Sequence, residues 1–320
     1  MRRRSMVLTA SLAVLAAPFP RGLRAQGGAT AAWAAPPIRL VLLFPPGVSP
    51  NAIGRRVAER LTANLGQTVV VENRPGAGGV IGADLVAKAP PDGHVLGVCN
   101  TASHAVGPAV DRAVPYDPLR DFTHIALLAE FPLALAVAAD GPIHGLSDFL
   151  AAARRTAGGL RVGTPGNGTA AHVGLEMIRA AAGAEIVHVP FDGGGAAMAT
   201  VAGRIEASFS GLGEVAGNDR VRLLALAARE RVPGWPAVPT FREEGLDLVA
   251  TAWFGLCGPA GLPAAVADRL HREAQAAVTA PEVAALLAWL GSAPNRGLSR
   301  AETTAFVAAE AKRTRQRPRV

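Results

Sequence analysis

Residues 38–73, IRLVLLFPPGVSPNAIGRRVAERLTANLGQTVVVEN, contain the pattern that decides the fold. Two apolar runs, at 38–44 and 68–73, are typical of buried strands. Between them, Ile53, Val57 and Leu61 recur every fourth residue, which predicts a helix with one buried face. A strand, a helix and a second strand in this order indicate a βαβ unit.

The ends of this helix also carry signals. Ser49 followed by Pro50 predicts an N-cap and a first helical residue, because proline lacks the N–H that would be unpaired there. Gly66 predicts the end of the helix, since glycine adopts the left-handed backbone of a C-terminal cap.

The same alternation of apolar runs and helical patterns continues along the chain. It predicts an α/β fold of mostly parallel sheets with helices on both faces. The further predicted strands are HVLGVC, LALAVAA, LRVGTP, EIVHVPF, EASFS, RLLALAA and WFGLC.

Two extended apolar segments closed by glycine and proline predict crossings between two domains. They are FPLALAVAADGP at residues 131–142 and ATAWFGLCGPAGLP at residues 250–263. We therefore expect a discontinuous first lobe, residues 37–132 plus 252–320, and a second lobe, residues 133–251.

The first 25 residues, MRRRSMVLTASLAVLAAPFPRGLRA, predict a signal peptide for export to the periplasm. Three arginines precede an apolar stretch that is too short to span a bilayer. Cleavage is expected near Ala25, with Ala32 and Ala34 as alternatives. The arginines fit twin-arginine export, but basic residues also begin signals of the general secretory route.

The net charge of +7 is concentrated at the two ends of the chain. Five arginines lie in residues 1–25, and five basic residues lie in the tail KRTRQRPR at 312–319. Without these ten, 22 basic side chains face 25 acidic ones. The body of the protein therefore lacks the basic charge that a nucleic-acid partner requires.

The two cysteines, Cys99 and Cys257, lie in apolar strand-like runs. In an exported protein they form either one disulfide or two buried free thiols, and the sequence leaves both open. They are too few for a zinc or iron–sulfur site on their own. His104, His172 and His188 do not have metal-ligand spacing, so we expect no metal and no cofactor.

A glycine-rich stretch, RPGAGGVIG at residues 74–82, resembles a nucleotide loop at first sight. Its glycines form G-x-G-G-x-x-G, which departs from the dinucleotide pattern, and no Gly-Lys-Ser/Thr follows. No acidic residue that would bind a ribose lies about 20 positions on. We interpret the stretch as a tight strand-to-helix turn.

Three other junctions between a strand and a helix are candidates for ligand binding. In PPGVSPN, residues 45–51, and TPGNGT, residues 164–169, free N–H groups at a helix start offer an anion site. His172 either donates to the ligand or bridges its own loop. The third junction is HVPFDGGGAAM at residues 188–198.

No catalytic residue is predicted. FSGLGE, with Ser210, does not match the G-x-S-x-G nucleophile elbow, and no acid–base pair or triad is evident. A secreted hydrolase using Ser103 or Ser210 is the alternative class, which turnover of ester substrates would reveal.

Together these segments resemble the Bug family, the periplasmic solute receptors of tripartite tricarboxylate transporters. The resemblance runs from about residue 37 to 310. It rests on PIRLVLLFPPG, LGQTVVVENRPGAGGVIGADLVAKAPPDGHVL, VPYDPLRDFTHIALLAE, GTPGNGTAAHVGLEMI, HVPFDGGGAA and VPTFREEGL.

The resemblance implies a type II periplasmic-binding-protein fold, in which two α/β lobes close around a small molecule, usually a carboxylate. Members usually carry an aspartate where Asn51 stands and a tyrosine–lysine pair where Phe191 and Asp192 stand. These departures change the charge pattern of the pocket and leave a neutral or aromatic ligand open. The tail from Lys312 also lacks the family's tryptophan-containing terminal helix.

From these patterns we expect a monomeric receptor, not an enzyme, that delivers a carboxylate to a membrane permease or presents it to a sensor-kinase ectodomain. The glycine turn should lie one strand away from the ligand cleft. The expected ligand-binding residues are Pro46, Gly47, Ser49, Asn51, Thr101, Ser103, Thr164, Asn167, Gly168, Thr169, His172, Phe191, Asp192 and Gly193.

Overall fold

The structure is a computed structural model that describes residues 36–46, 48–110, 113–191, 193–292 and 296–316. The predicted signal peptide lies outside the described residues. None of the helices within the described ranges has the length and apolar character needed to cross a membrane.

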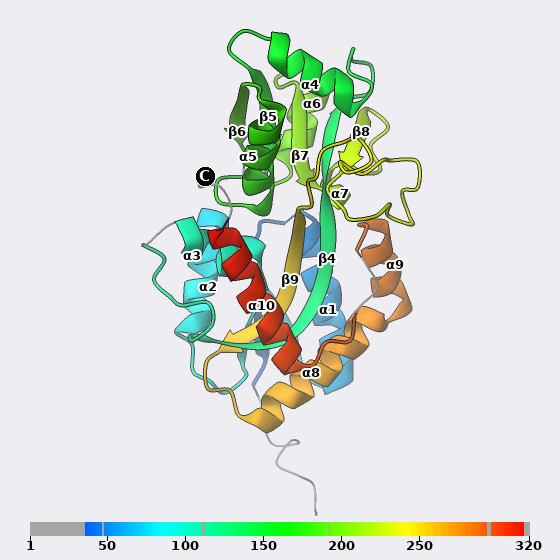
Figure 1. Ribbon diagram of the computed structural model, residues 1–320. Helices are drawn as coiled ribbons and strands as arrows, with labels where there is room; N and C mark the ends of the chain where they lie inside the picture. The colour runs from blue at the N-terminus through cyan, green and yellow to red at the C-terminus, as the bar shows by residue number, and fades with distance from the viewer. Residues whose placement is uncertain (1–35, 47, 111–112, 192, 293–295, 317–320) are drawn as a thin grey trace, which may run out of the picture.

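In the described part of the chain, nine strands form two sheet halves that share one long strand, β4 (Figure 1). The order along the sheet is β2-β1-β3-β9-β4-β7-β5-β6, and β8 also pairs with β4. The strands are β1 (Ile38–Leu42), β2 (Val69–Asn73), β3 (Val95–Asn100), β4 (Phe122–Ala138), β5 (Leu160–Thr164), β6 (Ile186–Pro190), β7 (Ala207–Gly211), β8 (Val221–Leu226) and β9 (Thr251–Pro259).

The strand β4 connects two lobes, which lie one above the other in Figure 1. From Phe122 to Pro132 it pairs with β9 in the first lobe, and from Leu133 it pairs with β7 in the second. The chain returns to the first lobe beside this point of β4, because Leu133 N donates to Ala250 O while Thr251 pairs with Pro132. The lobes are thus joined where β4 and β9 begin to pair.

Helices cover both faces of the first lobe's sheet. The helices α1, α8 and α9 pack on one face around Ile53, Leu61 and Leu270, and α2 and α10 pack on the other around Val86 and Val307. The elements are α1 (Ser49–Leu65), η1 (Ala77–Gly79), α2 (Val80–Ala87), η2 (Ala102–Val106), α3 (Gly107–Val110), α8 (Ala264–Thr279), α9 (Pro281–Trp289) and α10 (Arg300–Arg315).

The second lobe repeats this layering. Phe149 of α4 and Ile178 of α5 pack on one face of its sheet, while Ala197 of α6 and Leu212 of α7 pack on the other. Its helices are α4 (Leu146–Arg155), α5 (Ala170–Ala182), α6 (Gly195–Val201) and α7 (Leu212–Val215). We propose that residues 37–132 plus 252–320 form the first lobe and that residues 133–251 form the second.

Two local predictions differ from the structure. The N-cap of α1 is Val48, not Ser49, and both Asn51 N and Ala52 N donate to Val48 O, so the helix begins one residue early. The segment before residue 131 is also part of β4, because it pairs with β9 from Phe122 onward, and its Ile125, Ala126 and Leu128 pack in the first lobe's core. Gly66 caps α1 as predicted, with a φ of 65°.

Candidate functional site

A cavity of about 50 Å³ lies between the lobes where β4 and β9 cross. Both lobes and the crossing strands contribute its walls, and the space holds only a few water molecules. The lining residues are Phe44, Pro50, Asn100, Thr101, Ala102, Phe131, Leu133, Pro165, Thr169, Ala170, Ala171, Gly211, Glu214, Ala252, Trp253 and Phe254.

The first-lobe wall comes from the carboxyl ends of β1 and β3, where open α/β sheets bind ligands. Thr101 follows β3, and its hydroxyl accepts a hydrogen bond of 2.9 Å from Trp253 N. Asn100 Oδ1 accepts from Ser103 N at 3.0 Å, whereas Asn100 Nδ2 is buried without a partner. An amide donor therefore remains available on this wall.

The second-lobe wall is the start of α5. Thr169 is its N-cap: the hydroxyl accepts from His172 N at 3.2 Å and donates to Gly166 O at 2.9 Å. The side chain is thus used to shape the loop. The N–H groups of Ala170 and Ala171, at the first turn, have no acceptor within the helix and lie at its positive end. This turn offers a receptor for a carboxylate.

Two histidines stiffen the loop before α5. His172 Nδ1 accepts from Gly168 N at 3.3 Å, and His188 Nε2 is 2.7 Å from Thr164 Oγ1. The two rings stack with centroids 3.9 Å apart. Burial, and then the neighbouring His172, lower the pKa of His188 from 6.5 to about 4. Both rings are therefore neutral near pH 7, and His172 braces the loop.

The loop between β1 and α1 is held by amides. Asn51 Nδ2 and Asn73 Nδ2 both donate to Phe44 O, and Arg55 links the two by donating to Asn51 Oδ1 and Asn73 Oδ1. Asn51 is 2% exposed and does not line the cavity. It acts on the site through the position of Phe44.

Glu214, which we did not predict as a site residue, lies in α7 with its carboxyl at the cavity. The residue is partly exposed, but Oε2 is closed off from solvent and has no partner. Burial alone raises the pKa of this carboxyl to about 7. It is the acidic side chain among the described residues that line the cavity.

The structure brings Thr101 and Thr169 to the cavity itself. Ser49 lies at the lobe contact beside Pro50, since a Cβ added to Gly213 would come 3.0 Å from Ser49 Oγ. Gly193 lies against Val48 of the first lobe. Phe191 instead packs on Gly163 and Gly195 of its own lobe. The remaining predicted residues of the β1 and β5 loops, namely Pro46, Thr164, Asn167, Gly168 and His172, flank the cavity without lining it.

The other predicted residues are Gly47, Asp192 and Ser103. Gly47 and Asp192 lie outside the described residues. Ser103 is fully buried, and its hydroxyl contacts Asn100 O and His104 Nδ1 rather than the cavity. The structure does not bring Ser103 to the ligand site.

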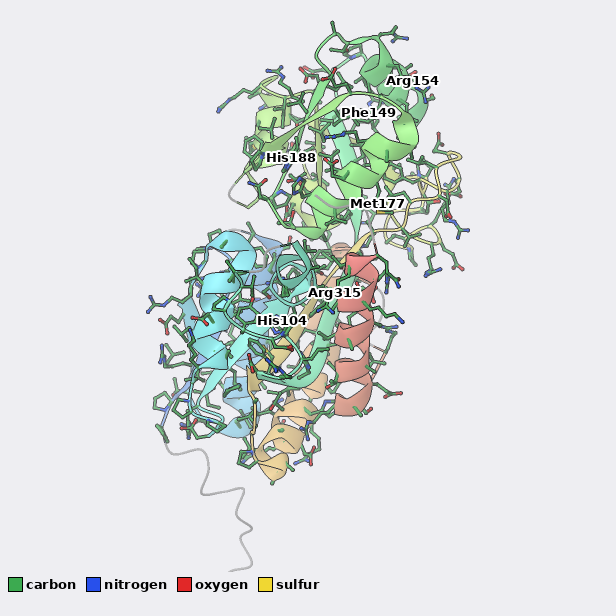
Figure 2. All side chains as sticks on the ribbon, turned by 60° about the vertical axis from the view of Figure 1, so that its left-hand side comes forward. His104, Phe149, Arg154, Met177, His188 and Arg315 are labelled. Atoms are coloured by element: carbon green, nitrogen blue, oxygen red, sulfur yellow. The ribbon has the colours of Figure 1, made fainter. Side chains whose placement is uncertain are left out.

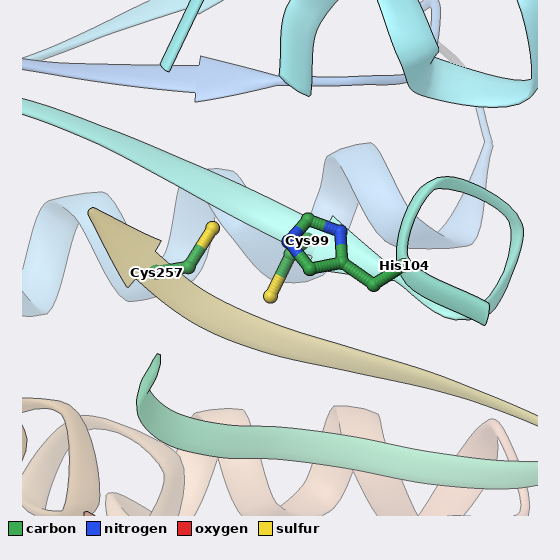
Figure 3. Close-up of side chains that lie close together, drawn as sticks. All are labelled: Cys99, His104 and Cys257. Carbon is green, nitrogen blue, oxygen red and sulfur yellow. The ribbon is translucent and has the colours of Figure 1, made fainter. Parts of the chain in front are cut away.

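Cys99 and Cys257 are buried free thiols on the neighbouring strands β3 and β9 (Figure 3). Their Sγ atoms donate to Gly255 O and Gly97 O, respectively. A nitrogen of His104 lies within 4.8 Å of both sulfurs, so these residues meet although their spacing did not indicate it. His104 is in the first lobe and His188 in the second (Figure 2).

The glycine turn follows β2, at the edge of the strand order β2-β1-β3, and lies close to the second lobe. Residues 76–79 all have positive φ, including Ala77 at 47°. A Cβ added to Gly78 would lie 3.8 Å from Asn167 O and 4.0 Å from Gly168 O. The turn thus reaches across to the loop before α5, although none of residues 74–82 is among the described residues that line the cavity.

The lobes also touch on the other side of the crossing strands. A Cβ added to Gly213 would come 1.9 Å from Leu290 Cδ2, and Trp235 Nε1 donates to Trp289 O at 3.3 Å. A larger cavity of about 840 Å³ lies there, where Glu130 pairs with Arg296. With so little room in the small cavity, a ligand must part the lobes to enter it.

Sequence reasoning missed the part of the cavity that comes from the crossing strands and from α7. Phe131, Trp253 and Phe254 lie in segments that the sequence predicts as strands or crossings between the lobes, not as parts of a ligand site. The signal for Glu214 was an acidic residue four positions after the strand EASFS, at a fourth strand-to-helix junction.

Two α/β lobes joined by crossing strands, with the start of a helix facing the space between them, define a periplasmic solute-binding protein of type II. The chain is similar to the Rhodopseudomonas palustris protein Rpa4515 solved with adipate, with a TM-score of 0.84 and 27% identity over 90% of this chain and 100% of the other. It is also similar to MatC from the same organism, solved with malate, with a TM-score of 0.79 and 29% identity over 87% and 97%.

Sequence relatives agree with the structural ones. A protein of the tcbD–tcbE intergenic region of Pseudomonas sp. strain P51 is 38% identical over 80% of this chain and 77% of the relative. BugT of Bordetella pertussis is 31% identical over 81% of each chain. Residues 53–317 match the family model of the tripartite tricarboxylate transporter family receptor. The chain belongs to this family, whose members are solute-binding receptors rather than enzymes.

Proposed function

We propose that this protein captures a small carboxylate between its lobes and delivers it to the membrane permease of a tripartite tricarboxylate-type transporter. The observation that carries the proposal is the start of α5, whose Ala170 and Ala171 face a cavity shared by both lobes. The malate in MatC and the adipate in Rpa4515 support the ligand class.

In this proposal each lobe supplies part of the binding energy. The N–H groups of Ala170 and Ala171 hold the carboxylate, and the Asn100 amide and the Thr101 hydroxyl reach it from the first lobe. Thr169 and His172 keep the loop in shape, as their hydrogen bonds indicate. Closure of the lobes excludes water and strengthens these hydrogen bonds.

The test is calorimetry with Ala170→Pro, using malate and adipate as first probes. Proline is tolerated at the first helical position, and Thr169 already has the extended backbone, φ −90° and ψ 164°, that precedes proline. The change removes one N–H and leaves the helix intact. We expect a loss of about tenfold to 100-fold in affinity, the worth of one hydrogen bond to a charged group.

The matched control is Ala170→Ser, which keeps the N–H and should bind nearly as the wild type does. Equal affinities of the proline and serine variants would show that the start of α5 does not bind the ligand.

Export and the partner are further parts of the proposal. We propose that residues 1–25 direct the chain to the periplasm, where it acts as a monomer. Cell fractionation of the full chain and of a form lacking these residues tests the export. Ligand-loaded protein should bind the permease; retention on a sensor-kinase ectodomain instead would assign it to signalling.

A further inference from the structure

Glu214 gives the cavity a feature that a receptor for simple dicarboxylates does not need. Among the described lining residues it has the only charged side chain, because the others are apolar, hydroxyl or amide residues and glycine. Its Oε2 is buried without a hydrogen-bond partner. An unpartnered carboxyl in a ligand cavity calls for a donor from the ligand.

The charged groups on the elements around α7 have other partners. Arg222 of β8 donates through Nη2 to Ala139 O, whereas its Nε is buried without a partner. Glu130 of β4 pairs with Arg296 and accepts from Thr251 Oγ1. Arg55 of α1 is bonded to Asn51 and Asn73. Neutral Ser49 and Leu290 are the side chains that face α7 at Gly213.

Burial without a partner is unfavourable for the ionised carboxylate, which is why the pKa of Glu214 is raised to about 7. A second carboxylate of a ligand brought beside it would raise the cost further by repulsion. A protonated amine would lower the free-energy cost of burying the ionised carboxylate, since the attraction in a charge pair shielded from water is strengthened by the low local dielectric. The site therefore discriminates between these two ligand groups.

The opposite wall has the complementary group. Asn100 Nδ2 is a buried donor without a partner, and the start of α5 supplies N–H donors. The cavity thus has donors for a carboxylate from both lobes, and on α7 it has the carboxyl of Glu214, whose Oε2 has no partner.

We propose that the natural ligand carries a protonated amine as well as a carboxylate, and that Glu214 selects it by binding the amine. The carboxylate lies at the start of α5, so this inference rests on the proposed function. Glu214 is then the residue that decides specificity.

Three matched pairs of probes test the inference by calorimetry at pH 8: succinate with aspartate, glutarate with glutamate, and adipate with 2-aminoadipate. Each pair differs by one amine. We expect the amine-bearing member of one pair to bind the wild type at least tenfold more tightly than its partner. Glu214→Gln, which keeps the shape of the side chain, should abolish that preference and bind the dicarboxylate as well as before or better.

The pH dependence of the wild type is an independent arm that needs no variant. Between pH 6 and 8 the ionised fraction of Glu214 rises about tenfold, so affinity for the amine probe should rise by up to that factor. Affinity for its dicarboxylate partner should fall over the same range.

The outcomes separate the two proposals. Dicarboxylates that bind more tightly than their amine partners, or an amine preference unchanged in Glu214→Gln, would overturn the role of Glu214 and leave the carboxylate receptor standing. Failure of all six probes to bind the wild type would overturn the proposed function, and this inference with it.

Discussion

At the scale of single residues, the two thiols show how completely the core of the first lobe is shielded from solvent. Cys99 is 1% and Cys257 2% exposed, and each sulfur donates to a carbonyl of the neighbouring strand. Burial raises the pKa of the Cys99 thiol well above its usual value, so the reactive thiolate is scarce.

We therefore expect neither cysteine of the folded protein to react with a disulfide reagent at pH 8, and both to react in guanidinium. The amount of thiolate that the reagent releases gives the number of cysteines that have reacted. A count of zero in guanidinium without reductant would show instead that the two cysteines form a disulfide.

The end of α1 and the start of α5 could be predicted, because helix caps follow local rules, whereas the N-cap of α1 is Val48 rather than the predicted Ser49. Thr169 precedes α5 as an N-cap should, and Gly66 ends α1. Glu214 and Asn100 could not be predicted from the sequence. Their role depends on whether buried polar atoms find partners, and those partners come from distant segments.

At the scale of elements, the stacked His172 and His188 make the loop before α5 sensitive to acid. The pKa of His188 is about 4 in the folded protein and 6.5 when unperturbed. Between these values the unfolded chain binds more protons, so the stabilisation from the neutral ring is present above pH 6.5 and is lost as the pH falls towards 4.

Thermal unfolding of wild type and His188→Gln between pH 7 and 4 checks this. Glutamine keeps a polar partner for Thr164 and does not titrate, so the wild type should lose stability relative to the variant as the pH falls. Parallel curves would contradict the prediction.

The contribution of Glu214 to stability changes with pH in the opposite direction, so this residue is replaced in the comparison. Its folded pKa of about 7 exceeds the usual 4.5, so its ionisation destabilises the ligand-free protein as the pH rises from 4.5 to 7. Comparing the Glu214→Gln variant with the double variant that also carries His188→Gln isolates the effect of the histidine.

The glycine turn at residues 76–79 shows where element-level prediction ends. Its backbone role could be predicted from composition, since consecutive positive φ angles favour glycine. Its approach to Asn167 O and Gly168 O depends on how the second lobe sits on the first, which no local pattern encodes.

At the scale of the whole molecule, α7 lies between the ligand cavity and the first lobe. Gly213 faces Leu290, and a Cβ there would come within 1.9 Å of that side chain. Leu290 is 2% exposed and packs in the first lobe's core, so it has little freedom to move aside. The closed arrangement therefore requires a residue without a side chain at position 213.

We expect Gly213→Ala to hold the lobes apart and to weaken ligand binding about fivefold or more, as overpacking by about 1 kcal/mol implies. Leu290→Ala in the same chain makes room for the new methyl group and should restore binding. Calorimetry on the four chains of this double-mutant cycle checks the coupling. Additive effects would show that the contact does not govern closure.

The α/β class and the two lobes could be predicted because strand and helix periodicity alternate along most of the chain. Family resemblance supplied the type of fold. The start of β4 was not predicted because its first half, residues 122–130, is largely buried on both faces and shows no regular alternation of polar and apolar residues.

The 17-residue strand β4 also has a consequence for folding. It passes from one lobe to the other without a break, and the first lobe is completed by β9 and α8–α10 after the second lobe has been synthesised. Neither half can unfold without disturbing the strand that both share. A two-lobed molecule built in this way should therefore melt as one cooperative unit, with a single calorimetric transition whose van't Hoff and measured enthalpies agree.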